Sequence, residues 1–298
     1  MVQNGEPIVL QLRLSSFNPG AIYSEKDKIK SNKAERRAQE MKYSMCADIM
    51  FVAPGEHGPI WPGADGLTEA MELAKKNGLY AIEFFDWEGR EIDKIAEASK
   101  KTGVEIKACC QKNGKLWGSP DKMDEFVEGF KESIPVAKQL KCKNLIVSDE
   151  LYPKDAEREV VHNAMVDGLK KIAPLAEKEN ITVLVEPLSN SYFTDSKEAF
   201  DIIKEVGSKN VKLLYDIFHF QLIEGNICNT IKENVEWIGH IHGAGVPMRC
   251  ELTEGELNYH FILNTIKESA YDGDFGLEFF TFENRDEKVA ASAKLVLE

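Results

Sequence analysis

Four residues able to bind a divalent cation end apolar runs of strand type in the second half of the chain. They are Glu186 in LVEPL, Asp216 in LLYDIFH, His242 in GHIHGAG and Glu278 in GLEFF, at successive intervals of 30, 26 and 36 residues. A carboxylate at the end of a buried strand is costly to desolvate unless a cation or a hydrogen-bond donor compensates it. Three carboxylates and one imidazole in one pocket therefore predict a divalent metal site, favouring Mn²⁺, Mg²⁺ or Co²⁺, with Zn²⁺ also suited.

Further polar residues stand at or just beyond strand ends. His219 follows three residues after Asp216, and Arg249 lies on the loop beyond the strand that carries His242. A guanidinium there could bind a substrate carboxylate or hydroxyls, although a surface arginine on a loop is the simpler interpretation. Glu83, near the end of the second predicted strand in AIEFF, is a candidate for substrate binding, for support behind the site, or for pairing with a buried cation.

Other residues near the predicted strand ends have weaker claims to function. His240 precedes His242 by two positions, so both side chains should point to the same face, with His240 deeper and structural. An aromatic side chain is more often packed than functional, and a Gly/Pro-rich loop or a buried thiol carries little signal by itself. The residues of this kind are Trp61, Trp87, Trp117, His57, Cys109 and Cys110.

The chain between these candidates alternates short apolar runs with longer segments of helical periodicity. The predicted strands cover residues 43–50, 79–85, 104–110, 144–148, 181–187, 211–216, 238–242 and 275–280. The predicted helices cover residues 67–76, 91–101, 121–140, 155–179, 196–206, 229–236 and 259–269, with Pro135 expected to kink or split the third.

This alternation predicts an α/β fold in which eight parallel strands close into a (β/α)8 barrel. A doubly wound open sheet is the structural alternative, but no GxGxxG follows the first strand. In such a barrel the carboxyl ends of the strands form the active-site face, which would bring the four candidate ligands together. Residues 42–298 form the predicted barrel domain.

Residues 1–41 form a predicted N-terminal arm, with a short strand over residues 8–14 and a basic stretch from Lys26 to Arg37. The arm would pack on the barrel or on a neighbouring subunit of a homo-oligomer. A regulatory or anion-binding arm is the alternative.

The chain of 298 residues carries a formal charge of −13 and has a pI near 5.1. Nonspecific binding to nucleic acid or to an anionic membrane needs a basic surface, so neither partner is expected. The six cysteines have no CxxC spacing, and no apolar run approaches the roughly 20 residues of a membrane span. The N-terminus lacks a secretory signal, and a cytoplasmic location is predicted.

Several segments also resemble, in order and spacing, the hydroxypyruvate isomerase branch of the xylose isomerase-like TIM-barrel superfamily. They are LVEPL, YDIFHFQLIEGNI, IGHIHGAGVPMRCELTEGELNY and YDGDFGLEFF, and the resemblance extends from about Lys42 to Phe280. It implies that Glu186, Asp216, His242 and Glu278 hold the metal. It further implies that Glu186 and Glu278 transfer protons, while His219 and Arg249 contact the substrate.

Two differences from the sequences of this branch bear on which substrate is predicted. Bacterial hydroxypyruvate isomerases can carry Gln where this chain has His242, so the chain looks more like the sugar 3-epimerases at that position. The connection PLSNSYFTDSKEAF after Glu186 looks shorter than the loop that helps to cover the ligand in many relatives. A shorter cover predicts a more open pocket, with room for longer sugars or glycosides.

The chemistry predicted from this constellation is an aldose–ketose isomerisation or an epimerisation through a metal-stabilised enediolate, with sugars or hydroxy-keto acids as substrates. One alternative is a C-glycoside deglycosidase-like lyase acting on 3-oxo glycosides, which would work with a second subunit. A noncatalytic sugar-binding protein is another. Endonuclease IV-like DNA repair is disfavoured by the few histidines and the acidic charge.

Overall fold

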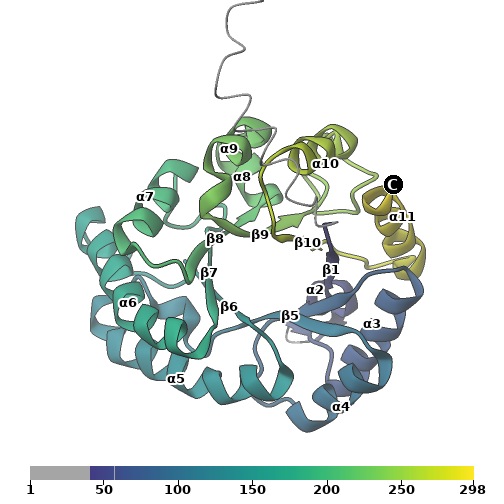
Figure 1. The fold of residues 1–298 in the computed structure, drawn as a ribbon, viewed down its shortest axis with the longest axis horizontal. Helices are drawn as coiled ribbons and strands as arrows, with labels where there is room; N and C mark the ends of the chain where they lie inside the picture. Colours follow the sequence, from purple (N-terminus) through teal and green to yellow (C-terminus); the bar gives the residue numbers. More distant parts are fainter. Residues whose placement is uncertain (1–40, 57) are drawn as a thin grey trace, which may run out of the picture. The chain divides into compact units, whose positions relative to one another are not determined.

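The core of the protein is a closed barrel of eight parallel strands surrounded by helices (Figure 1). This computed structural model describes residues 41–56 and 58–298. The strands follow the order β1-β10-β9-β8-β7-β6-β5-β4 around the barrel. Their bounds are β1 Tyr43–Cys46, β4 Ala81–Phe84, β5 Glu105–Cys110, β6 Asn144–Ser148, β7 Thr182–Glu186, β8 Val211–Asp216, β9 Ile238–Gly243 and β10 Asp274–Leu277. The predicted (β/α)8 barrel is confirmed.

Helices connect successive strands and form the outer layer of the barrel (Figure 1). The α-helices are α2 Ala47–Phe51, α3 Ala64–Lys76, α4 Ile92–Thr102, α5 Met123–Leu140, α6 Arg158–Glu179, α7 Ser196–Val206, α8 Ile217–Ile223, α9 Ile227–Asn234, α10 Tyr259–Glu268 and α11 Arg285–Leu297. The short 3₁₀ helices are η1 Gly114–Leu116, η2 Pro120–Lys122 and η3 Val235–Trp237. A two-stranded hairpin, β2 Ala53–Gly55 and β3 Gly58–Ile60, lies in the connection after β1.

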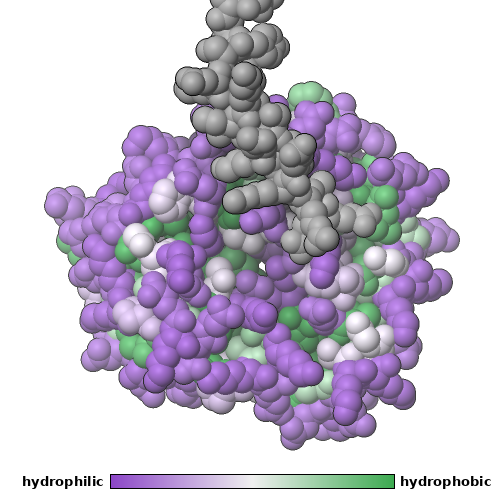
Figure 2. Space-filling model, viewed as in Figure 1, coloured by the Kyte–Doolittle hydropathy of each residue, from purple (hydrophilic) through white to green (hydrophobic). Residues whose placement is uncertain are grey.

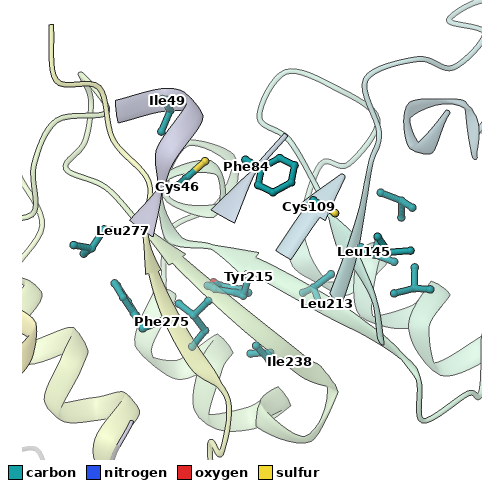
Figure 3. Close-up of a cluster of buried hydrophobic side chains, with 14 of the residues drawn as sticks. Cys46, Ile49, Phe84, Cys109, Leu145, Leu213, Tyr215, Ile238, Phe275 and Leu277 are labelled. Carbon is teal, nitrogen blue, oxygen red and sulfur yellow. The ribbon is translucent and has the colours of Figure 1, made fainter. Parts of the chain in front are cut away.

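Alternation along the strands separates an outer core from the barrel interior. Leu213 and Tyr215 of β8 belong to the large apolar cluster shown in Figure 3. Leu214 between them belongs to a small interior cluster with Ala108, Ile146, Leu184 and the partly buried Cys110. Since side chains two positions apart share a face of a strand, Asp216 points to the same face as Leu214. The pleat of β8 thus directs its terminal carboxylate into the barrel.

β1 and β10 end several residues before their predicted ends, whereas β4 and β7 end within about one residue of theirs. The apolar run from Tyr43 to Met50 divides after Cys46, where helix α2 begins, because Asp48 turns inward to bind neighbouring loops. β10 ends at Leu277, so Glu278 follows the strand directly. Helices α8 and α11 and the β2–β3 hairpin were not predicted. For α8 the reason is that it continues the apolar run of β8 without a turn signal.

The predicted helix ends agree with glycine capping. Gly103 and Gly207 follow α4 and α7 with φ of 78° and 69°, the left-handed conformation that glycine adopts without strain. The prediction that Pro135 could split its helix is wrong, because α5 continues through it from Met123 to Leu140.

The predicted N-terminal arm lies outside the described residues, apart from Met41. Within residues 41–56 and 58–298, no helix is long and apolar enough to cross a lipid bilayer. Hydrophilic residues cover most of the barrel face viewed in Figure 2.

A buried ion pair joins two connections at the active-site end of the barrel, the one after β1 and the one after β4. Arg90 donates to both oxygens of Asp48, over 2.9 and 2.7 Å, and to the carbonyl of Pro62 over 2.9 Å. Asp48 also accepts the backbone N–H of Phe85 over 2.6 Å. Burial raises the pKa of Asp48 even though Arg90 stabilises its charge. Removing Arg90 would therefore leave the buried carboxylate of Asp48 without a compensating charge, at a large cost in free energy.

Replacing Arg90 with Ala should lower the free energy of unfolding by about 3–5 kcal/mol, the usual cost of stranding one member of a buried pair. Urea denaturation followed by circular dichroism would measure the loss. Lys94→Ala, which removes the exposed pair of Lys94 with Glu91, should cost less than about 1 kcal/mol. Equal losses in the two variants would contradict a structural role for the Arg90 pair.

Candidate metal and active site

The four predicted ligands meet at the carboxyl ends of neighbouring strands. Glu186, Asp216, His242 and Glu278 each offer one ligand atom, and these atoms lie within 4.8 Å of one another. Glu186 and Asp216 end β7 and β8, His242 lies near the end of β9, and Glu278 follows β10. All four side chains are buried. Their arrangement could hold a divalent metal ion.

The orientation of His242 fits this donor set. Its Nε2 lies 3.0 Å from Oε2 of Glu83, to which it can donate. Its Nδ1 lies 2.9 Å from Oε2 of Glu278 and 3.7 Å from Oε1 of Glu186, yet makes no hydrogen bond with any described residue. With a metal ion bound, a neutral imidazole protonated on Nε2 would direct the lone pair of Nδ1 towards the ion, whereas without the ion the neighbouring Glu278 and Glu83 raise the pKa of His242 and favour the protonated ring. A buried nitrogen facing two carboxylate groups without a hydrogen bond suits a shared cation.

Glu83 lies behind His242 in the barrel interior. One of its carboxylate oxygens faces His242, and the other lies 2.9 Å from Nε2 of His240 and accepts the hydroxyl of Ser44 over 2.5 Å. The side chain is only 1% exposed. Burial alone would raise the pKa of Glu83, but the charges of His240 and His242 lower it well below its usual range. This enclosed position agrees with the candidate role of Glu83 behind the site, next to His242, while its substrate-binding role stays a prediction.

Arg249 reaches back from the β9 loop to two of the candidate ligands. One terminal nitrogen donates to Oδ2 of Asp216 over 3.0 Å and to Oε2 of Glu278 over 2.6 Å. The guanidinium also packs on the ring of Phe218, 5.0 Å from its centroid. Each carboxylate oxygen has two lone pairs, so these contacts leave acceptor capacity for a metal. Arg249 is therefore positioned at the edge of the cluster.

His219 lies beside Asp216 and is fixed by the loop after β7. Its Nδ1 accepts the backbone N–H of Ser189 over 3.1 Å. In the neutral ring this places the proton on Nε2, which lies 3.5 Å from Oδ2 of Asp216 and has no hydrogen-bond partner among the described side chains and backbone. Burial lowers the pKa of His219, which favours this neutral form. His219 is thus a donor available at the edge of the cluster.

The two glutamates of the cluster experience different electrostatic surroundings. Burial raises the pKa of Glu186 to about 7, assisted by the negative charge of Glu278. Burial would also raise the pKa of Glu278, but the charges of His242 and Arg249 lower it below its usual range. Burial would lower the pKa of His242, yet Glu278 and Glu83 raise it well above its ordinary value.

The weaker candidates are distributed around the barrel. Trp117 is fully buried and donates to the carbonyl of Ser148 over 2.8 Å, which is a packing role. Trp87 contacts Ser133 on α5, while Trp61 is 43% exposed and packs edge-on against Phe85. His57 lies outside the described residues. Cys109 is buried and Cys110 half-buried, and all six cysteines are free thiols.

Sequence reasoning missed Asp149, directly beyond β6. Its two oxygens accept the backbone N–H groups of Leu188 and Tyr192 over 2.8 and 2.9 Å, so it holds the loop that follows Glu186. Burial raises the pKa of Asp149 to about 6, although these backbone donors act in the opposite direction. The signal that could have identified it is the one used for the ligands, an acid at the end of an apolar strand.

A family model for the xylose isomerase-like TIM barrel matches residues 70–298. The chain belongs to this family. Membership agrees with the closed barrel and with the location of the acidic cluster at the carboxyl ends of its strands.

Curated relatives of the chain are named as isomerases. A putative hydroxypyruvate isomerase from Mus musculus is 29% identical over 239 residues, covering 74% of this chain and 86% of the relative. The hydroxypyruvate isomerase of Escherichia coli K12 is 32% identical over 165 residues, covering 54% and 64%. A 2-oxo-tetronate isomerase from Cupriavidus necator is 36% identical over 134 residues, covering 43% and 52%. These names support an enzyme of the isomerase class.

Solved structures share the fold at lower identity. An AP endonuclease family 2 structure from Brucella melitensis has a TM-score of 0.75 at 22% identity, covering 85% of this chain and 98% of its own. A D-allulose 3-epimerase from Methylomonas sp. has a TM-score of 0.74 at 15% identity, covering 86% and 96%. At these identities the likeness concerns the fold alone.

Glu83→Gln should weaken binding of Mn²⁺ by about 10- to 100-fold, the range typical for losing a carboxylate behind a histidine ligand. The amide cannot accept hydrogen bonds from His240 and His242 together, so His242 loses its fixed orientation. Calorimetric titration of chelator-treated protein would measure the affinity. Glu105→Gln changes the same charge at an exposed position of β5 and should leave it unaltered. An equal affinity in both variants would exclude this role for Glu83.

Proposed function

We propose that the protein is a metal-dependent isomerase or epimerase that interconverts hydroxy-keto acids or sugars by moving a proton at carbon next to a carbonyl. The observation that carries the proposal is the buried cluster of Glu186, Asp216, His242 and Glu278 at the active-site end of the barrel. The isomerase names of the curated relatives support the reaction class. Hydroxypyruvate and 2-oxo-tetronate, which those names contain, are both hydroxy-keto acids.

The metal proposed here is a divalent ion held by these four residues. Three carboxylates and one imidazole favour Mn²⁺, Mg²⁺ or Co²⁺, with Zn²⁺ also suited to the set. When bound, such an ion polarises the substrate carbonyl and makes the neighbouring C–H more acidic. The remaining chemistry belongs to the side chains around it.

Glu186 and Glu278 are the proposed proton-transfer groups. They come from β7 and β10, on either side of the strands that carry Asp216 and His242. A carboxylate takes the proton from the carbon beside the carbonyl, and the electron pair of that C–H bond forms the enediolate. Returning the proton to the adjacent carbon gives an isomer, whereas returning one to the opposite face of the same carbon gives an epimer.

His219 and Arg249 are the proposed substrate contacts. His219 presents an Nε2 beside Asp216 that has no hydrogen-bond partner among residues 41–56 and 58–298, and Arg249 lies against Asp216 and Glu278. Both groups can donate to substrate oxygens, and the guanidinium can pair with a carboxylate. They would fix the carbonyl and its neighbouring carbon relative to Glu186.

The mechanism predicts exchange of a substrate α-proton with solvent deuterium, accompanied by an isomerised or epimerised product. Metal-loaded protein would be incubated in D₂O with hydroxypyruvate, ketoses and 3-oxo glycosides, and followed by NMR. Glu186→Gln should reduce exchange by at least about 100-fold, the scale of a lost general base. Elemental analysis of the variant would separate a loss of metal from a loss of proton transfer.

Glu97→Gln on the exposed face of α4 is the matched control and should behave like the parent. Exchange that persists in Glu186→Gln with metal retained would remove Glu186 from the mechanism. Release of the aglycone from a 3-oxo glycoside, with no isomerised product, would instead assign the lyase reaction. If that reaction required a copurifying second subunit, the assignment would be strengthened.

Removal of the metal should lower the thermal stability of the protein, because the ion offsets the repulsion among three buried carboxylates. A site held at about 100 times its dissociation constant gains about 2.7 kcal/mol, or roughly 5–10 °C in Tm for a domain of this size. Calorimetry with EDTA and with added Mn²⁺ would measure the shift. Asp216→Asn should abolish most of the Mn²⁺-dependent increase, and an unchanged increase would argue against the proposed ligand set.

A further inference from the structure

The turn from Leu188 to Tyr192 is built around the buried carboxylate of Asp149, a residue that belongs to no part of the candidate metal cluster. Asp149 is 1% exposed, and its two oxygens accept the backbone N–H groups at the two ends of this turn. A carboxylate at this depth is costly unless donors compensate its charge. Here the compensating donors are backbone groups, so the charge of Asp149 and the shape of the turn depend on each other.

Further contacts fix the same turn from inside and outside the barrel. The hydroxyl of Ser191 donates to the carbonyl of Asp149. Arg158 donates to the carbonyl of Tyr192 over 3.1 Å, and its guanidinium packs 4.3 Å from the centroid of the Tyr192 ring. The backbone is therefore held on both sides of the middle of the turn.

Ser189, within the turn, contacts His219 through both its backbone and its hydroxyl. Its N–H donates to Nδ1 of His219 over 3.1 Å, and its Oγ lies 3.0 Å from the same nitrogen. A hydroxyl suits either tautomer because it can donate or accept, whereas a backbone N–H can only donate. Nδ1 must therefore present its lone pair, and the ring proton lies on Nε2. The backbone of Ser189 thus decides which nitrogen of His219 can donate.

The donor selected in this way faces the candidate active site. Nε2 of His219 lies 3.5 Å from Oδ2 of Asp216 and makes no hydrogen bond within the part of the chain that the structure describes. The other tautomer would present a lone pair at this point, where an oxygen of the proposed substrate needs a donor. The contact of His219 with a substrate therefore depends on the direction of one backbone N–H group.

Only a carboxylate can accept a hydrogen bond at both of its terminal atoms. The amide of an asparagine at position 149 would accept with one oxygen, while its NH₂ group would meet the other backbone N–H donor to donor. A buried donor left without an acceptor is unfavourable, so one end of the turn would be released. The N–H of Ser189 would then lose its fixed direction.

We propose that Asp149 is a positioning residue for the substrate contact of His219, because it holds the turn in the form that keeps Nε2 of His219 as the donor. The proposal rests on the proposed function in one respect, the contact of His219 with a substrate. An anchor that only stabilised the loop would alter the free energy of unfolding and leave the tautomer of His219 unchanged. The two interpretations therefore differ in an observable property of one ring.

Nitrogen NMR of the full-length protein, labelled with ¹⁵N-histidine and saturated with diamagnetic Mg²⁺, tests the tautomer without any substrate. The His219→Gln spectrum identifies the His219 signals. The parent should show His219 protonated on Nε2 and unprotonated on Nδ1, and Asp149→Asn should show a mixture of tautomers. Asp167→Asn, at an exposed position of α6, should match the parent. A parent His219 protonated on Nδ1, or parent nitrogen shifts in Asp149→Asn, would overturn the proposal.

Kinetics on a substrate that exchanges its proton give a second readout. Asp149→Asn should lower kcat/KM by about 10- to 100-fold, the scale of a misplaced substrate contact. In the His219→Gln background the same substitution should lower kcat/KM less than about twofold, because effects that act through one residue do not add. Equal losses in both backgrounds would assign Asp149 to the fold alone. If no substrate reacted even with the parent, the proposed function would fail, and the NMR result would still decide the role of Asp149.

A second pair of variants alters the turn without changing Asp149 or His219, and it carries the test if Asp149→Asn does not fold. Asn190 is exposed and has φ of 64°, a left-handed conformation that glycine adopts freely and that strains a β-branched residue. Asn190→Val should reproduce the mixed tautomers and the lower kcat/KM, whereas Asn190→Gly should behave like the parent. A folded Asn190→Val protein with the parent tautomer and the parent kcat/KM would overturn the proposal.

Discussion

The architecture of the site depends on the compensation of buried negative charge along the barrel axis. Glu83 is enclosed by Ser44, His240 and His242, and His242 in turn faces Glu278. An uncompensated carboxylate at this depth would cost several kcal/mol. The contact of its Nε2 with Glu83 favours one ring orientation of His242. In that orientation Nδ1 faces Glu278, so Glu83 helps to set the geometry of the candidate ligands.

The interior of the barrel divides into two halves with different chemistry. At the active-site end, β7, β8, β9 and the residue after β10 contribute charged side chains, whereas β5 and β6 contribute Cys110 and Ile146, which pack with Leu184 and Leu214 deeper in the barrel. The candidate ligands therefore gather on one side of the barrel mouth, and the space over β5 and β6 lies beside them.

The sequence was sufficient to predict the barrel and the cluster of three acids and one histidine, because both follow from alternation and from spacing along single strands. It offered a position behind the site as one candidate for Glu83 but could not choose among the candidates, since the choice depends on His240 and His242, which lie more than 150 positions away and become neighbours only when the barrel closes. The end of β1 was mispredicted for the same reason. An apolar run predicts a strand locally, but contacts of Asp48 with Arg90 and Phe85 favour a helix.

The loop after Glu186 is attached to the barrel by several hydrogen bonds, and these limit its movement whatever its length. Asp149 holds the backbone at Leu188 and Tyr192, and Ser189 holds His219. The rings of Tyr192 and Phe193 are buried against the barrel. A loop fixed at both ends has little freedom to close over a ligand, because closing it would break these contacts. The loop therefore fixes His219 beside Asp216, so the geometry at the edge of the cluster depends on the connection after β7.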